Sequence, residues 1–177
     1  MVRGASILDI KRLASPYYIS FDTLALEPKV IDGKVCTVVT EKKDKLLLDN
    51  RPLNNLKRAC EMYGTTLRQA IQISSKLIGN HHKVPVLIVQ DMGMPCIFLP
   101  TLSPQSDSNV WIGLHGIEDY WGDPNSCEIL LENGDAIRVN VSIQTMNRQY
   151  ALACRLDKKF SRMQYYLRHP GLDREFI

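Results

Sequence analysis

The sequence has no run of 18 apolar residues, and its N-terminus has no uninterrupted apolar stretch followed by small residues. The first absence argues against a transmembrane helix. The second argues against a secretory signal peptide. We therefore expect a cytoplasmic protein.

Motifs for metal binding, redox chemistry and hydrolysis are also missing. No two of the five cysteines have CxxC spacing, and no cysteine lies at zinc-finger distance from the pair His81–His82. We expect five reduced thiols acting as small apolar core residues, and no metal or other cofactor. His115 with Cys96 or Asp119 could form a nucleophile–base pair, but no nucleophile elbow or phosphate loop accompanies them. An enzyme is therefore not expected.

Charge is distributed unevenly, although the net charge of the chain is only +3. Residues 51–83 have a net charge of +5, and residues 138–168 have a net charge of +6. Between them, residues 84–137 contain eight acidic residues and no Lys or Arg. The chain therefore has a positive surface if the two basic blocks meet in the fold.

Periodicity predicts an α+β fold in one domain over residues 1–177. Alternating, β-branched or aromatic residues predict strands over 17–28, 34–41, 45–49, 83–89, 95–100 and 110–117. The segment 127–142 predicts a hairpin with a two-residue turn at Asn133–Gly134. These strands suit a mostly antiparallel sheet, to which a central helical hairpin and a long C-terminal helix are added.

The helical hairpin is predicted over residues 53–78. Gly64 separates its two helices, and Thr65 or Thr66 caps the second helix. The second helix directs Arg68, Gln69 and Gln72 away from its apolar side. This outline fits a helix-turn-helix motif that reads the major groove, and it also fits an ordinary helical hairpin.

The last predicted helix covers residues 143–167 and carries a basic stripe. Its four cations lie within about 60° of arc at about 100° per residue; they are Arg148, Arg155, Lys159 and Arg162. The expected apolar side consists of Ile143, Met146, Tyr150, Ala153, Cys154 and Phe160. Such a stripe can contact phosphates along a nucleic-acid backbone, or it can be the solvated side of the helix.

The order of several segments resembles the competence transcription factor (ComK) family of Gram-positive bacteria. The segments are IDGKVC, RPLNNLKRACEMYG, KVPVLIV, IFLPTLSPQSDSNVWIGLHGI, ILLENGDAIRVNVS and RLDKKFSR, within residues 28–162. The most specific element is IFLPTLS, followed by Trp111 and, four residues later, His115. Residues 163–177 form a short tail that matches the family poorly.

The resemblance implies a DNA-binding activator of DNA-uptake genes, located on the bacterial nucleoid. It implies recognition of paired A/T-rich boxes, mainly through the minor groove, by cooperating dimers that bend the site. Its expected partners are double-stranded DNA, further copies of the chain as a dimer or a dimer of dimers, RNA polymerase, and adaptor-directed proteolytic machinery. A minor-groove reader does not need a major-groove recognition helix, so the helical hairpin is then expected to touch phosphates only.

Charge alone selects the predicted DNA-binding residues. They are Arg51, Lys57, Arg58, Arg68, Lys76, His81, His82, Lys83, Arg148, Arg155, Lys159 and Arg162. The alternative is a regulator of the same family that has lost DNA binding and contacts other proteins through the acidic block. A steep dependence of DNA affinity on salt distinguishes the first hypothesis from the second.

Overall fold

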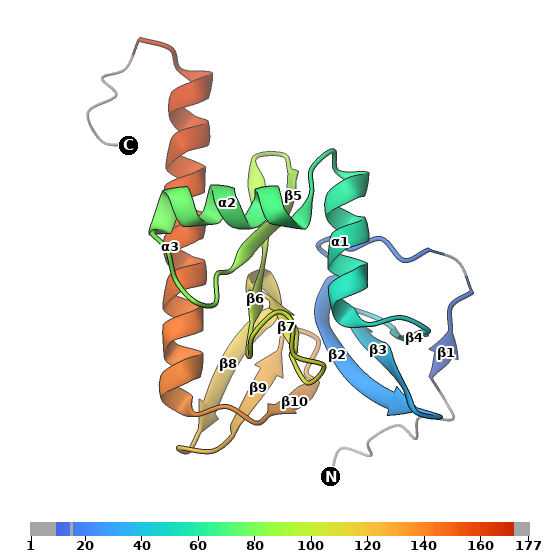
Figure 1. The fold of residues 1–177 in the computed structure, drawn as a ribbon. Coiled ribbons are helices and arrows are strands. Elements are labelled where there is room, and N and C mark those ends of the chain that lie inside the picture. The colour runs from blue at the N-terminus through green and yellow to red at the C-terminus, as the bar shows by residue number, and fades with distance from the viewer. Residues whose placement is uncertain (1–9, 15, 172–177) are drawn as a thin grey trace.

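The computed structural model describes residues 10–14 and 16–171, and its fold is of the predicted α+β class (Figure 1). A seven-stranded sheet has the order β1-β4-β3-β2-β7-β6-β5, and a three-stranded sheet has the order β10-β9-β8. The three α-helices are α1 (Pro52–Met62), α2 (Leu67–Ile78) and α3 (Ile143–Arg168). The strands are β1 (Lys11–Arg12), β2 (Thr23–Ile31), β3 (Lys34–Glu41), β4 (Lys45–Leu48), β5 (Val86–Asp91), β6 (Met94–Pro100), β7 (Trp111–Gly113), β8 (Ile117–Gly122), β9 (Cys127–Leu131) and β10 (Ala136–Val139).

The larger sheet is antiparallel apart from the short parallel pair β1–β4. Its central hairpin β2–β3 has a two-residue turn, because Ile31 pairs directly with Lys34. Asp32 and Gly33 both have positive φ, 49° and 75°. Two positive φ values give a turn whose twist matches that of the flanking strands, and Asp and Gly tolerate this conformation.

Alternation along the strands divides the core between the two faces of this sheet. In β6, Ile97 and Leu99 belong to the cluster that contains α3 and the smaller sheet. Cys96 and Phe98 belong to the cluster that contains α1 and the first half of α2. Successive residues of a strand point to opposite faces, so β6 contributes to both clusters. The helices therefore pack on both sides of one sheet.

The helical hairpin α1–α2 forms as predicted. Gly64, with φ of 79°, reverses the chain after α1. Thr66 Oγ1 accepts the N–H of Gln69 at 3.2 Å, and Gln69 Oε1 accepts the N–H of Thr66 at 3.0 Å. This reciprocal capping box fixes the start of α2. From there α2 runs beside the edge strand β5, from α1 to α3 (Figure 1).

The predicted strand over 110–117 is wrong, because the chain changes sheets within it. β7 covers only Trp111–Gly113, Leu114–Gly116 form a single 3-10 turn (η2), and β8 starts the smaller sheet. A Cβ atom on Gly116 would lie 3.1 Å from the Leu24 side chain, so glycine allows this bend to pack closely against β2. His115 therefore lies in a turn and not in an alternating strand.

The β9–β10 hairpin is confirmed, but its turn is longer than predicted. The N–H of Leu131 bonds the carbonyl of Asp135 at 2.8 Å, so three residues, 132–134, form the loop. Gly134 occupies its third position with φ of 87°. This arrangement is the common three-residue hairpin loop, in which glycine takes the left-handed position.

The segment before β2 is not a strand, although its apolar residues alternate. The N–H of Thr23 bonds the carbonyl of Ser20 at 3.0 Å in a turn, and β2 starts only at Thr23. Tyr17 is nevertheless buried, because its hydroxyl is 2.6 Å from both Thr23 Oγ1 and Glu41 Oε1. The alternating apolar residues before β2 are therefore buried or half-buried side chains of an irregular segment that pairs with none of the described strands.

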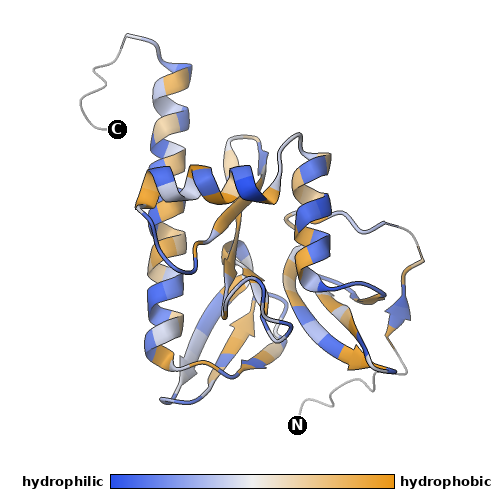
Figure 2. Cartoon of the chain, in the orientation of Figure 1, coloured by the Kyte–Doolittle hydropathy of each residue, from blue (hydrophilic) through white to orange (hydrophobic). Residues whose placement is uncertain are grey.

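The long helix α3 begins at the Ser142 cap, whose Oγ accepts the N–H of Thr145 at 3.2 Å. The predicted apolar side needs correction: Leu152 and Leu156 are buried, whereas Cys154 is exposed. The other four cysteines are buried free thiols. In Figure 2 all three helices carry alternating polar and apolar bands, as expected for helices with one buried side. None of the helices that the structure describes is long and apolar enough to cross a membrane.

Candidate nucleic-acid interface

The basic stripe of α3 lies on the surface. Arg148, Arg155 and Arg162 are exposed, and Lys159 is half-buried. Asp157 is the one acidic residue of α3. It follows Arg148 by nine residues, which places it about 180° away on the other side of the helix. No carboxylate of α3 therefore lies within the stripe.

Two contacts show which side of α3 carries the stripe. The Tyr150 ring packs on Tyr120 of β8, with ring centroids 5.3 Å apart. At the middle of the buried side, Gln149 Nε2 donates to the carbonyl oxygen of Lys83 at 3.4 Å, so the connection between α2 and β5 lies over that side. The stripe lies next to the buried side, on the edge away from Tyr150, at about 100° per residue. It therefore flanks the side of α3 that this connection covers.

That connection carries the end of the first basic block. Lys76, in the last turn of α2, and His82 are exposed. His81 and Lys83 are half-buried, and main-chain carbonyls hold their side chains. His81 Nε2 is 3.1 Å from the oxygen of Ile78, and Lys83 Nζ is 3.3 Å from the oxygen of Thr101.

The two basic blocks thus meet along the α2–α3 surface. We define this surface as Lys76, His81, His82, Lys83, Arg148, Arg155, Lys159 and Arg162. The sequence contains no Asp or Glu from residue 62 to residue 90, so the α2 side of this surface also has no carboxylate. Neither α2, nor its connection to β5, nor the stripe of α3 therefore contributes a carboxylate to this surface.

The remaining predicted residues lie apart from the α2–α3 surface. Arg68 is exposed in the first turn of α2, at the end next to α1. Arg51 precedes α1, and its Nη1 lies 2.9 Å from Asp107 Oδ1. Lys57 is exposed on α1. Only the second half of the first basic block therefore reaches α3.

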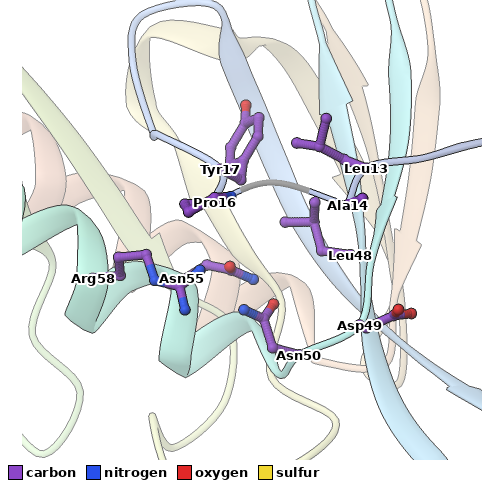
Figure 3. Close-up of a pocket in the computed structure, with 9 residues that line it drawn as sticks. All are labelled: Leu13, Ala14, Pro16, Tyr17, Leu48, Asp49, Asn50, Asn55 and Arg58. Atoms are coloured by element: carbon purple, nitrogen blue, oxygen red, sulfur yellow. The ribbon is translucent and has the colours of Figure 1, made fainter.

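Arg58 lies on the wall of a cavity of about 280 Å³ between α1 and the N-terminal segment (Figure 3). The opposite wall includes Tyr17 and Leu48, and Asn50 and Asn55 lie between Arg58 and these apolar groups. No residue of α2 or α3 lines this cavity. The fold therefore places no cation of α2 or α3 beside Arg58 in this cavity.

The acidic block is partly neutralised by cations from elsewhere in the chain. Glu132 pairs with Lys42 and Asp135 with Lys45, each at 3.2 Å, which ties the β9–β10 turn to β3 and β4. Glu128 lies 3.8 Å from Arg138, and Asp107 pairs with Arg51. Four of the eight acids in residues 84–137 therefore have a cationic partner.

The Cys96–His115 pair that the sequence suggested as nucleophile and base is not activated. His115 Nε2 donates to the carbonyl oxygen of Thr23 at 2.9 Å, which leaves Nδ1 facing Cys96 Sγ at 4.0 Å. Burial raises the pKa of Cys96 to about 12 and lowers the pKa of His115 below its usual value. The thiol therefore stays protonated. Within residues 10–14 and 16–171, no three His, Cys, Asp or Glu side chains are grouped closely enough to hold a metal ion.

Sequence reasoning missed the buried amides near α1. The side-chain oxygens of Asn50 and Asn55, and the side-chain nitrogen of Asn109, have no hydrogen-bond partner among the described residues. Asn carries no motif and no formal charge, so only its burial could have indicated it.

The fold and the α2–α3 surface define an α+β protein with a cluster of basic side chains on its helices. The family model described as ComK protein matches residues 14–164, so the chain belongs to the ComK family, which is a transcription-factor family and not an enzyme family. Among curated proteins it is similar to the competence transcription factor of Bacillus subtilis (strain 168). The two are 23% identical over 167 residues, which cover 89% of this chain and 86% of that protein. Comparison with solved structures gave no match.

Proposed function

We propose that this chain activates transcription of competence genes by binding double-stranded DNA through the α2–α3 surface. The observation that supports the proposal is the packing of α2 against α3, which brings the end of the first basic block to the helix that carries the basic stripe. Cations spaced along such a surface neutralise successive phosphates and release counterions. Membership of a family that includes a competence transcription factor supports the same function.

Recognition of paired A/T-rich boxes through the minor groove is part of the proposal. Narrow A/T-rich grooves have a strong negative potential that attracts Arg, Lys and His side chains. The α2–α3 surface offers all three types. By contrast, the major-groove hypothesis loses one of its three reading residues, because the capping box occupies the Gln69 side chain. The proposal includes three further partners besides DNA. They are other copies of the chain, which form dimers on the DNA, RNA polymerase, and an adaptor-directed protease.

Competition between groove-specific ligands tests the groove. The purified chain is bound to an A/T-rich duplex, and either a minor-groove ligand such as netropsin or a major-groove ligand such as methyl green is added. We expect netropsin to release the protein at concentrations at which methyl green does not. Release by methyl green alone would overturn the minor-groove assignment, and absence of any duplex binding would overturn the function.

A second candidate function is a regulator that contacts proteins and does not bind DNA. The observation in its favour is the β5–β6 turn, where Met92 is 92% exposed and Met94 is 58% exposed. The acidic block is less suited to be the protein-binding surface of such a regulator, because four of its carboxylates are in the ion pairs described above. This candidate predicts complex formation between proteins without any salt-dependent affinity for duplex DNA.

A further inference from the structure

A separate cavity of about 190 Å³ lies where the loop after β6 passes the start of α1. Arg51 and Lys57 line it from the helix side. Asp107 and Asn109 line it from the loop side, and Trp111 also contributes to its wall. None of the eight residues of the α2–α3 surface lines this cavity.

A buried amide donor marks the loop side. Asn109 is 2% exposed, and its Oδ1 accepts the N–H of Leu102 at 2.8 Å and faces the hydroxyl of Thr101 at 3.4 Å. Because the N–H of Leu102 can only donate, the orientation of the amide is fixed. Its Nδ2 then has no partner among the described residues. A buried donor without an acceptor destabilises the fold, so an acceptor that reaches the Asn109 amide from the cavity is favoured.

The helix side is also without an acceptor. No side chain of the described residues caps α1, and no acidic residue lies in its first turn. The helix end itself offers few donors, because Pro52 has no N–H and the N–H groups of Asn54 and Asn55 bond the carbonyl of Arg51 at 3.0 and 3.3 Å. The positive charge on this side therefore comes from the side chains of Arg51 and Lys57.

One carboxylate partly occupies this environment. Asp107 pairs with Arg51, but the two side chains are 52% and 57% exposed. Ion pairs at such exposure contribute little to stability, so a better acceptor can displace the carboxylate.

We infer that this cavity binds a phosphate group, held by Arg51, Lys57 and Asn109 Nδ2. Phosphate matches these donors because it has several acceptor oxygens and does not require an apolar pocket. The same chemistry is present in a DNA backbone and in a small phosphorylated molecule. The inference does not depend on duplex binding at the α2–α3 surface.

Solution NMR of the full ¹⁵N-labelled chain tests the site directly. Inorganic phosphate is titrated at constant ionic strength, with potassium chloride as the reference, and the side-chain amide signal of Asn109 is followed. We expect a saturable shift of this signal. Lys57→Gln weakens the phosphate affinity roughly tenfold, as expected for a lost charge-assisted hydrogen bond. Asp107→Asn strengthens it by up to about fivefold, because the competing carboxylate is gone.

Lys43→Gln is the matched control, because Lys43 is exposed in the turn before β4, away from the lining residues. It leaves the phosphate affinity unchanged. No shift at Asn109, or equal losses in the Lys57 and Lys43 variants, overturns the site. Both variants replace exposed lysines, so a loss of folding does not explain a loss of binding.

A second arm identifies the source of the phosphate. If an A/T-rich duplex shifts the Asn109 signal and inorganic phosphate reverses that shift, the site binds a backbone phosphate. If the duplex binds without moving Asn109 while inorganic phosphate still does, the site takes a small phosphorylated molecule. Either result supports the cavity as a phosphate site.

Discussion

Arg155→Ala is expected to reduce the salt dependence of duplex binding by about one counterion. Five members of the α2–α3 surface have a side-chain charge that no described contact engages; they are Lys76, Arg148, Arg155, Lys159 and Arg162. Lys83 is excluded because its ammonium group donates to the carbonyl of Thr101. Five phosphate contacts give a slope of log affinity against log salt of about −4.5. A rise from about 50 to about 200 mM salt then weakens binding about 500-fold.

Removal of one of these charges changes that figure measurably. With four contacts the slope becomes about −3.6, and the same rise in salt weakens binding about 150-fold. Lys159→Ala should behave like Arg155→Ala, because both belong to the stripe. The decrease in the salt slope should be similar for A/T-rich and other duplexes, because phosphate contacts carry no sequence information.

Fluorescence anisotropy of a labelled duplex over a series of potassium chloride concentrations measures the slope. Lys43→Ala is the control, since it removes one exposed cation that belongs to neither basic block. The reasoning is refuted if the wild-type slope is close to zero, which would favour the protein-interaction regulator. It is also refuted if Lys43→Ala lowers the slope as much as Arg155→Ala does.

Three predictions concern the fold. Thr66→Ala removes the cap of α2 and should lower the free energy of unfolding by about 1 kcal/mol in urea titrations, and an unchanged midpoint would contradict the capping box. Leu156→Ala empties a fully buried position of α3 and should cost about 2–5 kcal/mol by the same measurement, whereas a cost near that of Thr66→Ala would place Leu156 at the surface. Burial lowers the pKa of His115 in the folded chain, so the unfolded chain binds this proton more readily. The free energy of unfolding therefore keeps its His115 contribution above the unfolded-state pKa of about 6.5 and loses it as the pH falls below that value. His115→Gln should remove this part of the pH dependence, and an unaltered profile between neutral and acidic pH would show that His115 does not cause it.

Local chemistry made most of the helices and turns predictable. Asp32–Gly33, Gly64 and Thr66 act through their own backbone or through groups three residues away. Such short-range effects are visible in the sequence. The split of the predicted strand 110–117 depends instead on Leu24, which packs against Gly116 from nearly a hundred residues away.

The candidate site was predictable in part. The stripe of α3 follows from helical periodicity, and its exposure is as expected. The first basic block was treated as one unit, however, and the fold divides it. Lys76 and His82 lie toward α3, whereas Arg51 and Lys57 line a different cavity. That division depends on the path of α2 along the edge of the sheet, which no local pattern specifies.

The two anion-attracting regions differ in how they are built, and this difference has consequences for their variants. The α2–α3 surface consists mostly of exposed side chains without fixed partners, so it suits a polyanion that can be held by any of several cations. Loss of one cation there should therefore be graded and should act through the salt slope. The cavity beside α1 has one buried amide whose direction is fixed by Leu102. Loss of a donor there should change the affinity for a single phosphate strongly, while the salt slope changes by no more than one contact.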